Sequence, residues 1–376
     1  MKITHAKLLP YDLKLKKPFR TAHGTTHFRP ITLIALSSDD EQWGYGELEA
    51  FAQPTYTPET QETARLVICR YLLPLLEGQE LNCPEDVSKL FTVVQGNQMA
   101  KAALETAVWD LFAKHAQKNL SRLLSEHSQL SCRQSILVGI SIGAQSNASK
   151  MISEITAAVE KGYQRIKLKI TSTTEIEAFS RVRPLFPKIQ FILDANSSFT
   201  LKNTAQLKKL EKIKLAMIEQ PLDATDFTAH AELQKQIHVP ICLDENIFSL
   251  DDVRTAYQLR SAQAINLKLS RVGGLANALQ IIRFCNNHGL LVWCGGMLEG
   301  GIGRATNLAL ASLESLPFPG DISASDRYYQ KDIIEEQFSL KNGKLTIPTD
   351  NGIGVTLKKN IQKRLLKQPN ILKDTP

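Results

Sequence analysis

The sequence lacks the cysteine spacing of a disulfide framework or a zinc site. Its six cysteines form no CxxC pair and no regular pattern along the 376 residues: Cys69, Cys83, Cys132, Cys242, Cys285 and Cys294. Several of them lie in segments that we predict to be strands or helices. We therefore expect reduced cysteines in the core of a cytoplasmic protein.

Long apolar runs are also absent, and so is an N-terminal leader in which a basic segment precedes an apolar one. A membrane-spanning helix needs about 20 apolar residues in a row, and a secretory leader needs its apolar core. The sequence therefore predicts neither membrane insertion nor secretion.

Motifs for binding nucleic acid are missing as well. The formal net charge of +7 is compatible with such a partner, but the lysines and arginines are spread along the whole chain. We therefore expect no nucleic-acid partner.

The middle of the chain does contain a regular series of charged residues. Intervals of 25, 25, 25 and 24 residues separate Lys169, Asp194, Glu219, Asp244 and Lys268. Each of them closes a short apolar run of the kind that forms buried parallel strands. Segments with helical periodicity lie between these runs, which predicts an α/β fold whose parallel sheet closes into a barrel.

The N-terminal third has a different pattern. Strand-like runs over residues 2–13, 31–37 and 43–47 predict an antiparallel sheet, and helix-like segments follow over residues 59–76 and 99–117. Residues 19–30 are rich in Thr, His and Gly, which predicts a mobile loop. We predict an α+β domain over residues 1–130, a barrel domain over 131–320 and a C-terminal segment over 321–376.

The carboxyl ends of barrel strands form the active site because the βα loops meet there. Asp194, Glu219 and Asp244 offer only oxygen ligands, which favours Mg²⁺ or Mn²⁺ over zinc. Lys169 and Lys268 flank them and approach a substrate from opposite sides. Because a lysine near other cations has a lowered pKa, these residues predict removal of a proton next to a carboxylate. The alternative, a buried ion-pair network without chemistry, would make the even spacing a coincidence.

Five strings in this series resemble those of the muconate-lactonizing subgroup of the enolase superfamily. They are Lys167-Leu168-Lys169, Asp194-Ala195-Asn196, Glu219-Gln220-Pro221, Leu243-Asp244-Glu245 and Asn266-Leu267-Lys268. The resemblance implies a modified TIM-type (β/α)7β barrel with an N-terminal α+β capping domain, to which the C-terminal segment returns.

A narrower resemblance covers nearly the whole chain. Residues 96–101, 107–110, 293–299 and 319–328 are similar to segments of o-succinylbenzoate synthases, which often double as N-succinylamino acid racemases. This implies dehydration of 2-succinyl-6-hydroxy-2,4-cyclohexadiene-1-carboxylate in menaquinone synthesis, with racemisation of N-succinyl or other N-acyl amino acids as the alternative. A dipeptide epimerase is less favoured, since Asp321-Ile322-Ser323 lacks the Asp-x-Asp pair of that family. A non-catalytic scaffold would not need the intact lysines and carboxylates.

The same resemblance implies roles for the lysines. Lys169 removes the α-proton and then, once protonated, assists the departure of hydroxide. Lys268 stabilises the enediolate in the synthase reaction and becomes the acid or base on the opposite face in racemisation. Lys167 tunes the pKa of Lys169.

It also implies the rest of the site. Asp194, Glu219 and Asp244 hold Mg²⁺, or alternatively Mn²⁺, and residues 19–30 close over the substrate. Asn196 and Glu245 lie near these ligands and support them, or instead cap a loop and pair with a lysine. The succinyl side is lined by Ser141, Gly295, Gly296 and Met297. A small carboxylate is the expected partner, and a homo-oligomer is the expected assembly.

Three positions depart from the family pattern. Asn246 stands where Ser is usual, and Leu269 stands where Pro is usual. Gly300 stands where Ser or Thr is usual. None of them removes a ligand or a base. We expect them to influence the shape of the pocket rather than the type of reaction.

Overall fold

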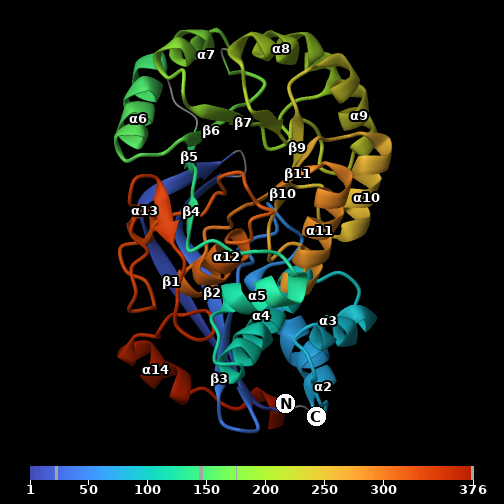
Figure 1. The fold of residues 1–376 in the computed structure, drawn as a ribbon, viewed down its shortest axis with the longest axis vertical. Coiled ribbons are helices and arrows are strands. Elements are labelled where there is room, and N and C mark those ends of the chain that lie inside the picture. Colours follow the sequence, from blue (N-terminus) through green and yellow to red (C-terminus); the bar gives the residue numbers. More distant parts are fainter. Residues whose placement is uncertain (22–23, 144–146, 175, 374–376) are drawn as a thin grey trace.

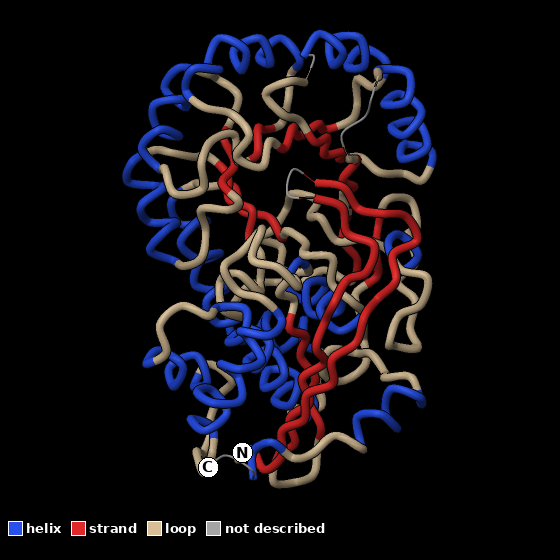
Figure 2. The backbone as a smooth tube through the Cα atoms, turned by 180° about the vertical axis from the view of Figure 1, so that it is seen from behind, coloured by secondary structure: helices blue, strands red, loops and turns tan. Residues whose placement is uncertain are grey.

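The structure is a computed structural model that describes residues 1–21, 24–143, 147–174 and 176–373. An antiparallel sheet with its helices forms one end of the molecule, and a curled parallel sheet surrounded by helices forms the other (Figure 1). Two long strands of the antiparallel sheet run from the first end to the side of the barrel (Figure 2).

The antiparallel sheet has three strands in chain order, β1 (Ile3–Thr21), β2 (Gly24–Ser38) and β3 (Trp43–Leu48). The pairing of β1 with β2 continues beyond a register shift to Phe19↔Thr26 and Thr21↔Gly24. The prediction of a mobile loop over residues 19–30 is therefore wrong for its described part, while residues 22 and 23 lie outside the described residues. Threonine favours strands, and the ladder provides hydrogen-bond partners for the backbone of this segment.

Helices of this domain pack against the sheet. They are α1 (Gln61–Val67), a π-helical turn (Ile68–Leu72), α2 (Leu73–Leu76), α3 (Asp86–Leu90), α4 (Gln98–His115) and α5 (Leu120–Ser128). Helix α4 packs directly on β3. The approach is so close that an added Cβ at Gly46 would lie only 2.0 Å from the carbonyl oxygen of Ala103. Helix α4 also contacts α11 of the barrel, so both domains bury it.

The barrel sheet contains seven parallel strands, in the order β5 to β11. Their bounds are β5 (Ile140–Ile142), β6 (Arg165–Lys169), β7 (Gln190–Asp194), β8 (Met217–Glu219), β9 (Ile241–Leu243), β10 (Ala264–Leu267) and β11 (Leu291–Cys294). Two backbone hydrogen bonds connect the ends of the sheet through the segment 320–321: Gly139 N donates to Gly320 O at 2.8 Å, and Asp321 N donates to Cys294 O at 3.0 Å. The predicted barrel class is confirmed.

An arc of helices lies on the outer side of this sheet (Figures 1 and 2). It contains α6 (Ala148–Glu160), α7 (Ile176–Val182), α8 (Thr204–Lys208), α9 (Phe227–Gln236), α10 (Leu250–Leu259) and α11 (Leu275–His288), and α12 (Gly301–Ala311) follows β11. Side chains cap several of these helices, as when Asp226 accepts from Ala229 N and Ser249 accepts from Asp252 N. Side chains from one face of β6, including Ile166 and Leu168, pack with the helices in a single core.

The C-terminal segment runs back along the molecule through α13 (Ser325–Tyr328), β12 (Lys344–Thr346), which pairs with β4 (Ser135–Leu137), and α14 (Lys359–Leu366). Helix α14 contacts β1, and Asn370 Oδ1 accepts a hydrogen bond of 2.9 Å from Ala6 N. The domain bounds stay a prediction.

All six cysteines are free, three buried and three half-buried. Among the described residues, no helix is both long and apolar enough to cross a bilayer.

Candidate active site

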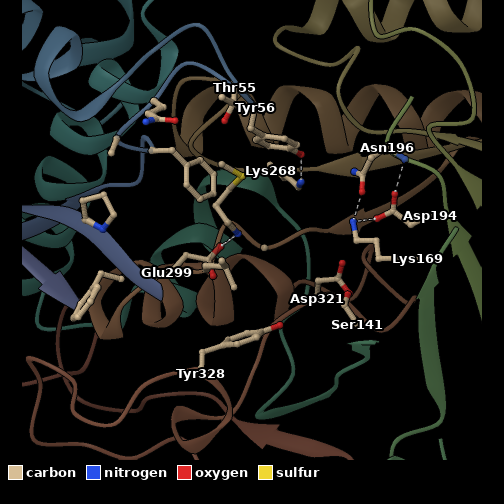
Figure 3. A pocket seen from close by; sticks show the side chains of 18 of the residues that line it. Thr55, Tyr56, Ser141, Lys169, Asp194, Asn196, Lys268, Glu299, Asp321 and Tyr328 are labelled. Atoms are coloured by element: carbon tan, nitrogen blue, oxygen red, sulfur yellow. Dashed lines mark hydrogen bonds and ion pairs between the residues drawn. The ribbon is translucent and has the colours of Figure 1, made fainter. Parts of the chain in front are cut away.

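The carboxyl ends of the barrel strands open into a pocket of about 510 Å³ that the capping domain covers (Figure 3). Its barrel side is polar and includes Ser141, Lys167, Lys169, Asp194, Asn196, Lys268 and Asp321. Its roof is mainly apolar and includes Phe28, Pro30, Phe51, Tyr56, Met297 and Leu298. The pocket can therefore hold a charged group against the strands and an apolar group under the roof.

Strand register converts the regular spacing in the sequence into a row of charges. Lys169 pairs with Asp194 across β6 and β7, and Asp194 pairs with Glu219 across β7 and β8. Glu219 then pairs with Cys242, two residues before Asp244. Because parallel strands in register lie about 4.8 Å apart, side chains 25 residues apart in sequence become neighbours.

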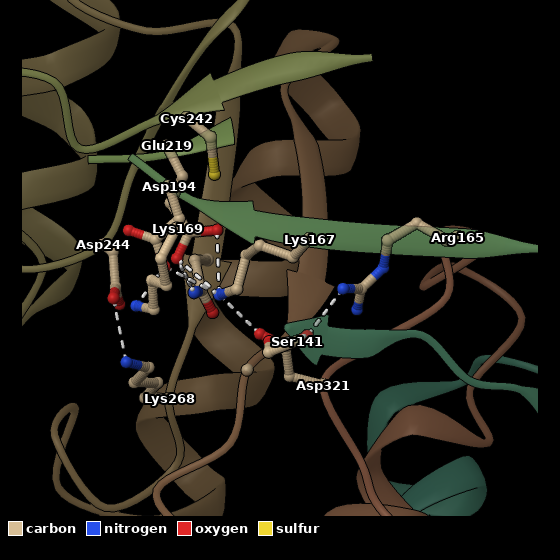
Figure 4. Close-up of polar contacts among 12 residues, drawn as sticks. Ser141, Arg165, Lys167, Lys169, Asp194, Glu219, Cys242, Asp244, Lys268 and Asp321 are labelled. Carbon is tan, nitrogen blue, oxygen red and sulfur yellow. Dashed lines mark hydrogen bonds and ion pairs between the residues drawn. The ribbon is translucent and has the colours of Figure 1, made fainter. Parts of the chain in front are cut away.

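The three predicted lysines all contact carboxylates at this rim (Figure 4). Lys169 Nζ lies 2.6 Å from Asp194 Oδ2 and donates to Asn196 Oδ1 at 2.5 Å. Lys268 Nζ lies 2.8 Å from Asp244 Oδ2. Since β6 and β10 lie on either side of β7, β8 and β9, Lys169 and Lys268 flank the row of carboxylates.

Lys167 lies deeper than Lys169 and contacts more carboxylates. Its Nζ is 2.9 Å from Glu219 Oε1, 3.2 Å from Asp194 Oδ2 and 2.6 Å from Asp321 Oδ2. Burial alone lowers the pKa of Lys167, but Asp321, Glu219 and Asp194 together raise it well above its usual value. Lys167 is therefore a fixed cation beside Lys169.

The pKa values of two neighbouring buried carboxyls are shifted in opposite directions. Burial raises the pKa of Glu219 to about 8, helped by the charge of Asp194 and opposed by Lys167. It also raises the pKa of Asp194, but Lys169 and Lys167 outweigh burial and leave that pKa below its usual value. Glu219 therefore has less compensating positive charge around it than Asp194 has.

The donor chemistry of Asp194, Glu219 and Asp244 fits a divalent cation. These are three oxygen donors on neighbouring strand ends, and the raised pKa of Glu219 shows where further positive charge would stabilise the site. In the described part of the chain, however, no three Asp, Glu, His or Cys side chains are grouped closely enough to hold an ion. Each of the three carboxylates contacts a lysine.

The structure separates the predicted substrate-binding residues. Ser141, Gly296 and Met297 line the pocket. Gly295 does not: it packs behind the lining, where an added Cβ would lie 2.0 Å from Asn266 Oδ1 and 2.9 Å from Lys268 Cγ. Close packing against Asn266 and Lys268 accounts for glycine at this position.

Asn196 and Glu245 form a chain that ends at Lys169. Asn196 accepts from Lys169 Nζ, and its own Nδ2 donates to Glu245 Oε1 at 2.7 Å. Burial, helped by the charges of Asp244 and Asp194, raises the pKa of Glu245 to about 7. Both residues therefore orient the side chains around Lys169, and only Asn196 reaches the pocket.

Sequence reasoning missed two residues of this site. Tyr56 reaches Asp244 from the capping domain although 188 residues separate them, and no local pattern indicates such a contact. Arg271 pairs with Asp244 Oδ1 and donates to Tyr56 at 3.2 Å. For Arg271 the sequence did offer a signal, because it is a charged residue in the turn just after β10.

The three departures from the family pattern lie behind the pocket wall. Asn246 accepts a hydrogen bond from Gln220, which in turn accepts from Asp244 N at 2.9 Å. Leu269 is buried in the main core. At Gly300 an added Cβ would lie 2.8 Å from Glu47 Oε2, so this chain needs glycine where its neighbour is a buried glutamate.

Comparison with known proteins gives a consistent result. Residues 3–125 match the N-terminal domain of mandelate racemase and muconate lactonizing enzyme, and residues 150–361 match the enolase C-terminal domain-like family. The chain is 46% identical to an o-succinylbenzoate synthase of Enterococcus faecalis over 98% of both chains. It is 38% identical to an N-succinylamino acid racemase of Thermus thermophilus over 95% of both.

The solved structures agree with this. An enolase-superfamily member from Listeria innocua has 45% sequence identity and a TM-score of 0.94, with 97% of each chain covered. Together with the capping sheet, the curled barrel and the row of charges at its rim, these matches establish that the chain belongs to the enolase superfamily.

Proposed function

We propose that this protein is an o-succinylbenzoate synthase that depends on Mg²⁺, with Mn²⁺ as the alternative. The observation that carries the proposal is the placement of Lys169 and Lys268 on either side of Asp194, Glu219 and Asp244, at one pocket. A base on one side of the substrate and a cation on the other suit removal of a proton next to a carboxylate. Relatives of 39–46% identity with this name support the choice.

The charge balance of the site supports a substrate with two carboxylates. Five acidic groups face five basic ones: Asp194, Glu219, Asp244, Glu245 and Asp321 against Arg165, Lys167, Lys169, Lys268 and Arg271. With all ten groups charged, a divalent cation would leave the site with two positive charges, and with one when Lys169 is the neutral amine that a base requires. The two carboxylates of 2-succinyl-6-hydroxy-2,4-cyclohexadiene-1-carboxylate would offset this charge.

Lys169 performs both proton transfers in the proposed reaction. As a neutral amine it takes the proton from the carbon that bears the ring carboxylate. It then returns this proton to the departing hydroxyl, so that the carbon–oxygen bond breaks and water leaves with an aromatic ring as product. Asn196 and Asp194 hold the amine in place for both steps.

The other residues act on charge and on solvent. Lys268 remains a cation and stabilises the negative charge that develops on the substrate. Asp194, Glu219 and Asp244 would hold Mg²⁺, which would supply further positive charge to stabilise the enediolate. The apolar side chains of Phe51 and Met297 limit the access of water to the reacting carbon.

Racemisation of N-succinylamino acids is the second candidate. It is favoured by Lys268, which lies across the pocket from Lys169 and offers an amine for the opposite face (Figure 3). A dipeptide epimerase is disfavoured further, because Asp321 is already paired with Arg165 at 2.6 Å and with Lys167. It therefore offers no free charge to a substrate ammonium.

Turnover of the cyclohexadiene carboxylate, followed by absorbance with Mg²⁺ and with a chelator, tests the proposal. We expect a chelator-sensitive kcat/KM of at least about 10⁴ M⁻¹s⁻¹, the lower end of ordinary enzymes. Absence of turnover, combined with racemisation of N-succinylamino acids, would assign the second candidate instead.

A further inference from the structure

We propose that Tyr56 is a positioning residue through which the capping domain holds Lys268 in its working place at the barrel rim. The inference rests on the proposed function only for the role of Lys268. Tyr56 lies in the segment between β3 and α1, and its phenol enters the pocket next to Lys268 (Figure 3).

A closed group of hydrogen bonds surrounds the phenol oxygen. Lys268 Nζ donates to it at 2.5 Å, and Arg271 Nη1 donates at 3.2 Å. The hydroxyl in turn donates to Asp244 Oδ2 at 3.0 Å, the same oxygen that accepts from Lys268 at 2.8 Å. The ammonium group is thus held between a barrel carboxylate and a phenol of the capping domain.

The segment that presents Tyr56 is itself fixed. The ring of Tyr56 packs edge-on against Phe51 with centroids 6.0 Å apart, and the Arg29 guanidinium lies 4.0 Å from the centroid of Phe51. Arg29 donates to Ala50 O at 2.8 Å and to Met297 O at 3.1 Å, so it connects the segment to the turn after β11. These contacts connect the segment that carries the phenol to both domains.

This arrangement has a chemical consequence. Lys268 must keep its ammonium aimed at the substrate, and a flexible side chain with a single acceptor samples several rotamers. Removing the phenol oxygen leaves Asp244 as the acceptor that the structure provides for Lys268. The aromatic ring, 4.8 Å from Lys268 Nζ, would remain in a phenylalanine variant.

The experiment compares Tyr56→Phe with Tyr71→Phe, which removes the hydroxyl of an exposed tyrosine on the same domain. The first readout is reductive dimethylation of each lysine in the metal-free protein, quantified by peptide mass spectrometry. The second is the kinetics of dehydration and racemisation with Mg²⁺.

We expect Tyr56→Phe to speed dimethylation of Lys268 by about tenfold, the effect of losing one hydrogen bond to a charged group. The labelling of Lys169 and the melting temperature should not change. Its kcat should fall by about tenfold at constant KM, because a misplaced cation weakens the transition state rather than the ground state. Tyr71→Phe should match the wild type in every readout.

Unchanged labelling of Lys268 in Tyr56→Phe would overturn the proposal, and so would an equal rise at Lys169 and Lys268, which indicates general loosening. A wild-type protein with neither activity would count against the proposed function. The labelling comparison would still decide the role of Tyr56 in that case.

Discussion

Lys169 and Lys268 are the same residue type in different surroundings. Lys169 contacts Asp194 and the neutral amide of Asn196, whereas Lys268 contacts Asp244 and a phenol from the other domain. The side chain of Lys169 is 16% exposed and that of Lys268 is 8% exposed. The more accessible amine is the better candidate for the proton transfers of the dehydration.

At the scale of single residues, we expect Lys169→Ala to lower kcat for dehydration and racemisation by about 10²–10⁴-fold, the usual contribution of a general base. The melting temperature should stay near that of the wild type, because the amine lies at the rim of the pocket. Steady-state assays of both reactions provide the measurement.

Lys188→Ala is the matched control, since Lys188 is an exposed lysine just before β7. It should leave both activities unchanged. An active Lys169→Ala variant would contradict the proposed mechanism.

The second prediction concerns Lys268→Arg. Arginine keeps the positive charge but does not titrate in the working range. Racemisation, which needs an acid or base at this position, should therefore fall more than dehydration, which needs only the charge. The ratio of the two kcat/KM values measures this, and equal losses would mean that Lys268 has one role in both reactions.

At the scale of elements, α4 joins the two domains. Its residue Glu105 accepts from Leu275 N and Ala276 N, both at 2.8 Å, and so caps the first turn of barrel helix α11. The Glu105 carboxyl also accepts from Trp109 Nε1 at 2.7 Å. Burial raises the pKa of Glu105 to about 7 despite these three donors.

This raised pKa leads to a prediction for Glu105→Gln. Between pH 4.5 and 7 the unfolded chain releases the proton of Glu105 while the folded chain keeps it, so the free energy of unfolding falls as pH rises. The folded protein loses up to about 3 kcal/mol over this interval, at about 1.4 kcal/mol per pKa unit. The variant does not titrate here, and its melting temperature should therefore rise relative to the wild type between pH 5 and 7.

Glu154→Gln, a change at an exposed glutamate on α6, is the control for calorimetry over the same pH series. Its difference from the wild type should stay constant. If Glu105→Gln behaved in the same way, the titration of Glu105 would not be coupled to folding.

At the scale of the whole molecule, metal binding tests the charge balance of the site. An ion that binds only the folded chain stabilises it by mass action, by about 2.7 kcal/mol at one hundred times its dissociation constant. We expect MgCl₂ to raise the melting temperature, and KCl of equal ionic strength to raise it less. Equal effects of the two salts would contradict the assignment of Asp194, Glu219 and Asp244 as ligands.

The barrel and the row of charges at its rim follow from the sequence alone. Regular spacing is sufficient for this, because neighbouring strands of a parallel sheet follow one another in the chain and residues at equivalent strand ends meet. The spacing therefore predicts that Lys169, Asp194 and Glu219 lie side by side, and the strand register confirms it. The roles of these residues stay a prediction.

The distant residues that complete the site depend on how the two domains pack. Tyr56 meets Lys268, and Glu105 meets α11, across the interface between the domains. Gly295 serves packing, and the described part of residues 19–30 is paired as strand. The periodicity of a segment predicts its local secondary structure. Contacts between domains depend on how their complete surfaces pack together, and no single segment determines that packing.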